Sequence, residues 1–213
     1  MNDETPKPRW GTRLLHRPGW LIALAVCLLL SAVLVPFGWR YYRTQQLVAG
    51  IEAHGGFVLF EGDSPVEFLL DLNDSWQSCF KQSVQVHVGE GTFDDRYFRE
   101  FLIPLNELHE LTVLSVGTSE ISKSRIAEWN QFQKLYLLSI SGDNVDDEFL
   151  RQIGLLPNLR FLALDNSQVT DEGLRHLSGL KNLTELSLSN TDVTDEGVSE
   201  LQRHLPGLDV SDD

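Results

Sequence analysis

The sequence is poor in cysteine, and this shortage excludes several classes of protein. Only two cysteines occur in 213 residues, Cys27 and Cys79, and neither belongs to a CxxC motif. A disulfide framework or a cysteine-based zinc site needs more cysteines at closer spacing. The histidines share no metal-ligand spacing either; they are His16, His54, His87, His109, His176 and His204. The sequence therefore predicts no metal site.

Positive charge is scarce outside the first residues. The chain has 17 basic and 31 acidic side chains, a formal net charge of −14. Residues 1–17 carry four basic and two acidic side chains, so the remainder carries −16. An acidic surface of this kind repels nucleic-acid phosphates and anionic lipid headgroups. We expect no nucleic-acid partner.

The sequence also lacks a catalytic set and a glycine-rich phosphate loop. Gly173 and Gly197 recur at a fixed interval, as do the acidic pairs that precede them. These pairs suggest a cation site, but their regular recurrence favours a role in helix-start electrostatics. We therefore predict that the protein is not an enzyme and has no cofactor.

One long stretch lacks charge altogether. Residues 18–39 contain no charged side chain and are flanked by Arg17 and Arg40. At 1.5 Å per residue such a helix reaches about 33 Å, enough to cross a bilayer. Trp20 and Trp39 stand where an interfacial aromatic belt is expected. A cleaved signal peptide has a shorter apolar region than this one. A lipoprotein cysteine stands after the end of the apolar region, whereas Cys27 lies inside it. An uncleaved anchor is therefore favoured.

The charge bias around this stretch predicts its orientation. Four basic residues precede it, whereas only Arg40 and Arg43 follow closely. Basic flanks tend to stay in the cytoplasm. We expect a single-pass protein of the plasma (inner) membrane, with a cytoplasmic tail at 1–17 and the remaining chain extracytoplasmic.

An internal repeat of 24 residues fills the C-terminal half. Residues 158–174 read NLRFLALDNSQVTDEGL and residues 182–198 read NLTELSLSNTDVTDEGV. Two earlier copies at 134–150 and 110–126 keep the same apolar positions, and a fifth begins near Val86 after a four-residue insertion. One repeat cannot bury its apolar face alone, so the copies must stack.

Each copy contains two periods. Leu162-Ala163-Leu164 alternates as a short strand, whereas Leu174, Leu177 and Leu180 share a helical face. All five junctions carry a helix N-cap residue, namely Asp94, Ser122, Asp146, Thr170 and Thr194. Each cap lies between an apolar staple pair: Phe93/Phe98, Ile121/Ile126, Val145/Leu150, Val169/Leu174 and Val193/Val198.

The pattern LxxLxLxx[ST]xVTDEGLxxLxxL resembles the leucine-rich-repeat family. The VTDEGL phrase is similar to the cysteine-containing-like subclass, and the arrangement behind an anchor is similar to short membrane-anchored bacterial repeat proteins. The resemblance implies an α/β solenoid, with short parallel strands on the concave face and helices on the convex face. It covers residues 84–210 and says little about function.

Residues 40–83 connect the anchor to the repeats. Tyr41–His54 is predicted as a helix that ends at Gly55-Gly56, and residues 57–60 as a strand. Capping signals at Ser64–Glu67 and Asp74–Gln77 predict two short helices. We expect an N-terminal cap here, so the domains are 1–17, 18–39, 40–83 and 84–213.

The third strand position of each repeat should face the concave side, away from the core. Those residues form an apolar ladder with an acidic end: Val113, Leu137, Phe161 and Glu185. Small residues fill the fifth position, which are Ser115, Ser139, Ala163 and Ser187. Stacked neighbours at strand spacing cover one another without any ligand, so mutual packing is one reading of the ladder and a partner-binding groove is the other.

These observations lead to one functional hypothesis and two alternatives. The leading hypothesis is a membrane-tethered, non-catalytic module that binds a protein or peptide through Val113, Leu137, Phe161 and Glu185. The first alternative is a structural or spacer component of the cell envelope without a specific ligand. The second is an enzyme of unknown class.

Overall fold

The computed structural model describes residues 18–61, 83–88, 93–117, 120 and 122–211. The chain divides into two compact units, Met1–Arg43 and Thr44–Asp213. Both cap helices expected at Ser64–Glu67 and Asp74–Gln77 lie outside the described residues, as do the side chains of Ile121 and Ile126.

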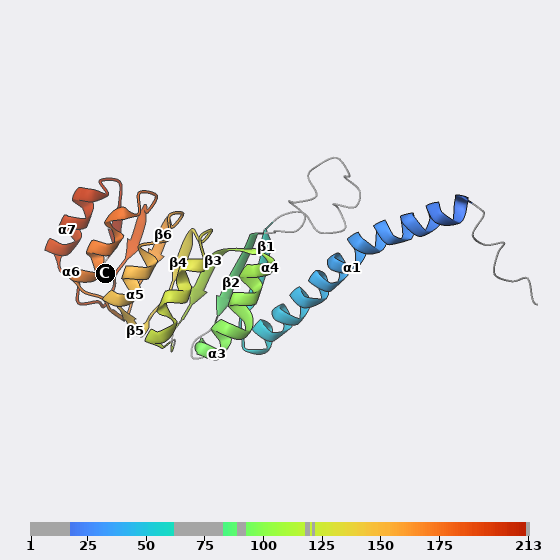
Figure 1. Ribbon diagram of the computed structural model, residues 1–213. Helices are drawn as coiled ribbons and strands as arrows, with labels where there is room; N and C mark the ends of the chain where they lie inside the picture. Colours follow the sequence, from blue (N-terminus) through green and yellow to red (C-terminus); the bar gives the residue numbers. More distant parts are fainter. Residues whose placement is uncertain (1–17, 62–82, 89–92, 118–119, 121, 212–213) are drawn as a thin grey trace, which may run out of the picture. The chain divides into compact units, whose positions relative to one another are not determined.

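The first described element is helix α1, Pro18–Ala53, which runs unbroken for 36 residues (Figure 1). Residues 20–53 are long and apolar enough for a membrane span, by length and composition. The sequence predicted a separate helix from Tyr41, but nothing in residues 40–53 breaks the helical backbone. The expected end is confirmed, because Gly55 has a φ of 78° and Gly56 N donates to Ile51 O at 3.1 Å.

In the second unit, the last turns of α1 supply Leu47 and Ile51 to the core. One side of the core is formed by a seven-stranded sheet in the order β1-β2-β3-β4-β6-β8-β9. Only β1 is antiparallel to its neighbour; the other pairs are parallel. The strands are β1 Phe57–Glu61, β2 Ser83–Val88, β3 Glu110–Val116, β4 Leu137–Ser139, β6 Phe161–Ala163, β8 Glu185–Ser187 and β9 Asp209–Ser211.

The register confirms the phase of the repeat. Leu138, Leu162 and Leu186 pair in sequence across β4, β6 and β8, and all three are buried. Strands β4 and β6 show the same burial pattern, with a buried residue between two half-buried ones. Hydrogen bonds between adjacent strands and this shared apolar column join each repeat to the next.

Helices cover one face of this sheet (Figure 1). They are shorter and less regular than the apolar period predicted: the expected helix through Leu180 is a four-residue α-turn followed by a 3-10 segment. The elements are α3 Asp95–Tyr97, the π segment η2 Phe98–Leu102, α4 Ile103–Leu108, the 3-10 segments η3 Lys123–Gln131 and η4 Arg175–Gly179, α5 Asp147–Ile153, α6 Asp171–Leu174 and α7 Asp195–His204. A second, two-stranded sheet, β5 Gly142–Asp146 with β7 Ser167–Gln168, was not predicted.

All five predicted N-cap positions are confirmed. The side chains of Asp94, Asp146, Thr170 and Thr194 accept a backbone N–H of the helix that follows. Ser122 also occupies the cap position but makes no side-chain cap bond, and its hydroxyl donates instead to Asp95 Oδ2 at 2.6 Å.

Aromatic residues fill the core under the first repeats. Trp129 is fully buried, and its ring contacts the rings of Phe98, Phe132 and Phe149 at centroid distances of 5.5, 5.8 and 5.0 Å. Leucines dominate the later repeats, where the spacing is regular.

Candidate binding surface on the open sheet face

The sheet face that the helices leave uncovered, here called the open face, carries the predicted ladder. Val113 pairs with Leu137, Leu137 with Phe161, and Phe161 with Glu185. Side chains in direct register on one face lie about 4.8 Å apart. The structure therefore brings the four predicted residues into one continuous row.

The members of this row differ in exposure. Val113 is only 4% exposed, so its side chain is closed to a partner in this structure. Leu137 and Phe161 are half-buried and Glu185 is exposed. The accessible part of the ladder thus begins at Leu137, one repeat later than the sequence suggested.

Small side chains line a shallow groove beside the ladder. The groove has a volume of about 310 Å³. Its small lining residues are Ser139, Ala163, Ser187 and Ser211. Their small size leaves room over β4, β6, β8 and β9 for a ligand to lie close to the sheet.

Two side chains contact the Phe161 ring: Arg160, the preceding residue, and Tyr136, which precedes the paired residue Leu137. The Tyr136 ring lies 6.4 Å from the Phe161 ring in a T-shaped arrangement, and the Arg160 guanidinium lies 5.9 Å from its centroid. Both contacts restrict the Phe161 ring without burying it. A restricted, partly exposed aromatic ring is typical of binding hot spots.

The row extends further than the sequence predicted. At the far end Asp209 pairs with Glu185, and at the near end Leu59 pairs with Gln85, which in turn pairs with Val113. Strand β9 was missed because residues 206–213 do not carry the leucine pattern of the other copies. The signal for it was the alternation of Leu208 and Val210, both at least partly buried.

The recurrent acidic residues have a structural role. Asp147 Oδ1 and Oδ2 accept the backbone N–H and the hydroxyl of Thr170 in the next repeat at 2.9 and 2.8 Å. Asp171 makes the same two bonds to Thr194, both at 2.8 Å. Asp147 and Asp171 therefore each link their own helix to the next helix start, beyond the dipole effect that the sequence predicted. No cluster with the makings of a metal site occurs among the described residues.

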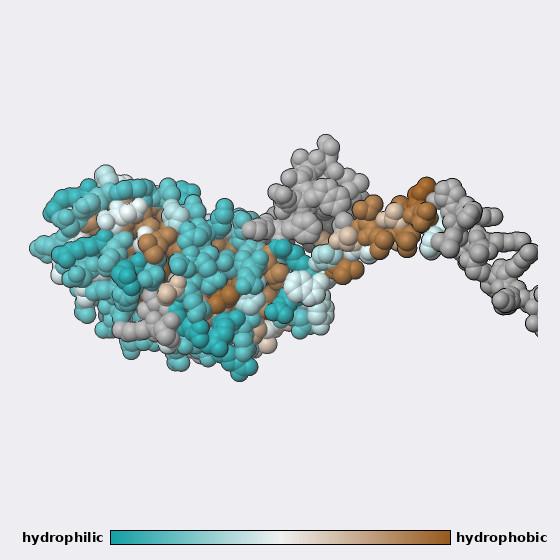
Figure 2. Space-filling view, in the orientation of Figure 1, coloured by the Kyte–Doolittle hydropathy of each residue, from teal (hydrophilic) through white to brown (hydrophobic). Residues whose placement is uncertain are grey.

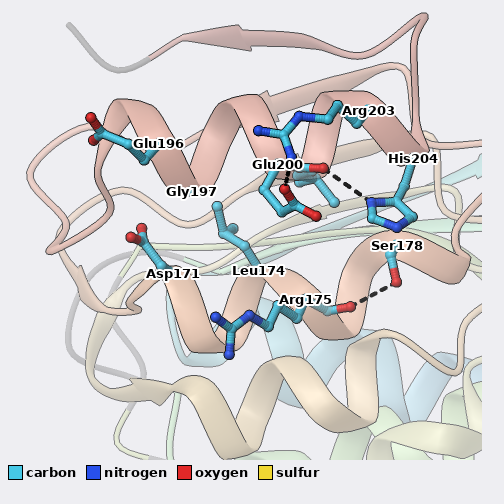
Figure 3. Close-up of a pocket in the computed structure, with 10 residues that line it drawn as sticks. Asp171, Leu174, Arg175, Ser178, Glu196, Gly197, Glu200, Arg203 and His204 are labelled. Carbon is cyan, nitrogen blue, oxygen red and sulfur yellow. Dashed lines mark hydrogen bonds and ion pairs between the residues drawn. The ribbon is translucent and has the colours of Figure 1, made fainter.

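A second, larger cavity of about 540 Å³ lies on the helical side between α6–η4 and α7 (Figure 3). Several of its charged groups have local partners: Arg203 pairs with Glu200, and His204 Nδ1 lies 3.0 Å from Glu200 O. Ser178 donates its hydroxyl to Arg175 O at 2.8 Å. Mixed, exposed and locally paired charges of this kind define no particular ligand.

Comparison with known proteins supports the repeat type. Residues 179–201 match the family described as Leucine Rich repeat. No curated protein matches the chain. Among solved structures, the chain is similar to an internalin (inlF) from Listeria monocytogenes, with 32% identity, a TM-score of 0.41, and coverage of 53% of this chain and 31% of that chain. It is also similar to an internalin C2 (inlC2) from Listeria monocytogenes, with 18% identity, a TM-score of 0.39, and coverage of 60% and 69%.

The family match and the parallel, in-register strands support a leucine-rich-repeat family and an α/β repeat fold for this chain. The chain spans about a third of the length of the first of these internalins. The VTDEGL subclass stays a prediction.

Proposed function

We propose that the protein is a non-catalytic, membrane-tethered module that binds a protein or peptide on its open sheet face. The observation that carries this proposal is the half-buried, in-register Leu137–Phe161 pair beside a column of small side chains. Repeat modules of this kind present extended binding surfaces, and leucine-rich repeats generally bind proteins.

The second unit is mostly polar on the face that Figure 2 shows. The visible face of the repeats is mostly hydrophilic with a few apolar patches, whereas the first half of α1 is strongly hydrophobic (Figure 2). On a hydrophilic surface, a partly exposed aromatic side chain with an adjacent hollow is a site where a partner gains burial.

The membrane tether is part of the proposal. Residues 18–39 would span the bilayer, 1–17 would remain cytoplasmic, and residues 40–83 would cap the repeats at 84–213. The support is the apolar composition of the span and the basic residues before it. Anchoring would restrict the groove to partners close to the outer surface of the inner membrane.

The test is site-specific photocrosslinking in native membranes. A photoreactive residue at position 161 should give a discrete crosslinked product, and Phe161→Asp should abolish partner capture from a second reporter position at Ser139. The melting transition should change little, because a half-buried strand residue contributes modestly to the core. Leu155→Asp is the matched control, since Leu155 is exposed and does not line the groove.

Two outcomes would count against this function. Loss of folding in Phe161→Asp would make the ring a core residue. Equal capture by the Phe161→Asp and wild-type proteins would move binding away from the open face.

A further inference from the structure

The groove on the open face is divided into an apolar half and an acidic half. Leu137 and Phe161 line one half, and Glu185 and Asp209 line the other. Because these four residues are successive partners in register, the division runs across the strands, along the direction in which the repeats stack.

The acidic half carries charge that the described residues do not compensate. Glu185 and Asp209 are direct cross-strand partners, and both side chains are exposed. Neither carboxylate has a hydrogen bond or an ion pair within the described part of the chain, whereas the nearby Asp165 accepts from Ser187 and from Ser189 N. Like charges placed directly opposite one another in a sheet are destabilising. A cation placed between them would remove this repulsion.

Resting on the proposed function, we propose that the groove selects a cationic–apolar peptide segment of a protein partner. Its apolar side chain would lie on Leu137 and Phe161, and a Lys or Arg would lie between Glu185 and Asp209. The occupant is chosen by charge complementarity: the carboxylates repel acidic segments and phosphates, and the adjacent apolar wall gives a purely polar cation no burial.

The geometry sets the spacing of the two anchors. The centres of the apolar and acidic halves are two strands apart, roughly 10 Å. A polyproline-type segment returns to the same face every three residues, at about 9 Å. An extended segment returns after two residues, at about 7 Å, and a long Lys or Arg side chain covers the difference. The two anchors should therefore be two or three residues apart.

The experiment measures peptide binding to the full-length protein in nanodiscs. The probes are fluorescein-labelled peptides that carry one Phe and, two or three residues away, a Lys, Gln or Glu; fluorescence anisotropy reports binding. The Lys peptide should bind roughly fivefold to tenfold more tightly than the Gln peptide, and the difference should shrink at high salt, because two partly exposed ion pairs are expected to contribute modestly.

Charge reversal provides the decisive comparison. Glu185→Lys with Asp209→Lys should invert the preference, so that the Glu peptide binds best. Asp143→Lys with Asp192→Lys is the matched control: it makes the same change in net charge at exposed acids outside the groove and should leave the Lys preference intact.

The outcomes separate this inference from the function on which it rests. Binding that depends on Phe161 but not on the peptide charge would overturn the cationic partner and leave the binding groove. If the Asp143→Lys/Asp192→Lys control also inverted the peptide preference, the preference would depend on overall charge, and the inference would be overturned. Absence of binding by every peptide, or binding unchanged by Phe161→Asp, would overturn both.

Discussion

The glycine of the VTDEGL phrase offers a sharp test of how neighbouring repeats are joined. Gly197 lies in the first turn of α7 with an ordinary helical backbone, where Ala would normally be favoured by about 1 kcal/mol. A Cβ at this position would overlap Asp171 Oδ1 of the preceding repeat. That carboxylate cannot move away freely, because it holds Thr194 through two hydrogen bonds of 2.8 Å.

Helix propensity and overpacking act in opposite directions, so the effect of Gly197→Ala on the free energy of unfolding should change sign when the Asp171 carboxylate is removed. In the wild-type protein, Gly197→Ala should lower the free energy of unfolding by about 1–2 kcal/mol, as overpacking outweighs helix propensity. Asp171→Ala alone should cost about 1 kcal/mol, because Thr194 is exposed and water replaces part of the lost bonding. In the Asp171→Ala background the carboxylate overlap is removed and only the Cβ of residue 171, at 3.1 Å, remains close, so Gly197→Ala should stabilise by about 0.5 kcal/mol.

A double-mutant cycle measures this reversal. Urea unfolding of the detergent-solubilised full chain, followed by circular dichroism, gives the four free energies, and the coupling should be roughly 1.5–2.5 kcal/mol. Gly179→Ala is the control, since no heavy atom lies within 4 Å of its added Cβ. Equal effects of Gly197→Ala in both backgrounds would refute the idea that Asp171 imposes the glycine.

Three further predictions follow from the fold and the anchor. Leu162→Ala should cost about 2–5 kcal/mol as a buried truncation and Thr170→Ala about 1 kcal/mol as a lost cap; a neutral Leu162→Ala in urea melts would contradict the assigned core face. For Asp95, burial opposes ionisation but is outweighed by hydrogen bonds from Ser122 and by nearby Arg125 and Arg99, so its pKa lies below the usual value. Its stabilising effect is therefore full above the usual Asp range and is lost as pH falls through the lowered pKa; Asp95→Asn should flatten the acid-side loss of stability, and an unchanged profile would argue against the contact. The full-length protein should stay in the membrane pellet after alkaline washing with residues 1–17 attached, and an N-terminus mapped after Trp39 would contradict the uncleaved anchor. Protease added to spheroplasts should digest the repeats, and protected repeats would reverse the predicted orientation.

Much of the fold was predictable because its determinants are local. The N-cap at Thr170, the strand at Leu162 and the turn at Gly55 each depend on a few consecutive residues, and the structure confirms all three. The 24-residue recurrence then supplied the stacking order, because equivalent positions of similar units pair when the units stack. The row from Val113 to Glu185 followed from that register alone.

Other features depend on distances between repeats, and the sequence pattern does not contain those distances. The acidic pairs were interpreted as helix-start electrostatics, but Asp147 and Asp171 act on hydroxyls 23 residues further along the chain. The type of helix could not be predicted either. The apolar period predicts a helical face, but it does not distinguish an α-turn from the 3-10 segment at Arg175–Gly179.

By itself the sequence determined the repeat unit, its inside and outside, its helix starts and the apolar stretch that precedes it, because periodicity and capping act within one turn or one strand. Only the packed structure showed that Val113 is closed while Phe161 is open, that Asp209 extends the row, and that a glycine faces a carboxylate from the preceding repeat. Those outcomes depend on which atoms of separate repeats come within contact distance, and burial at one position is set by neighbours that lie far away in the chain.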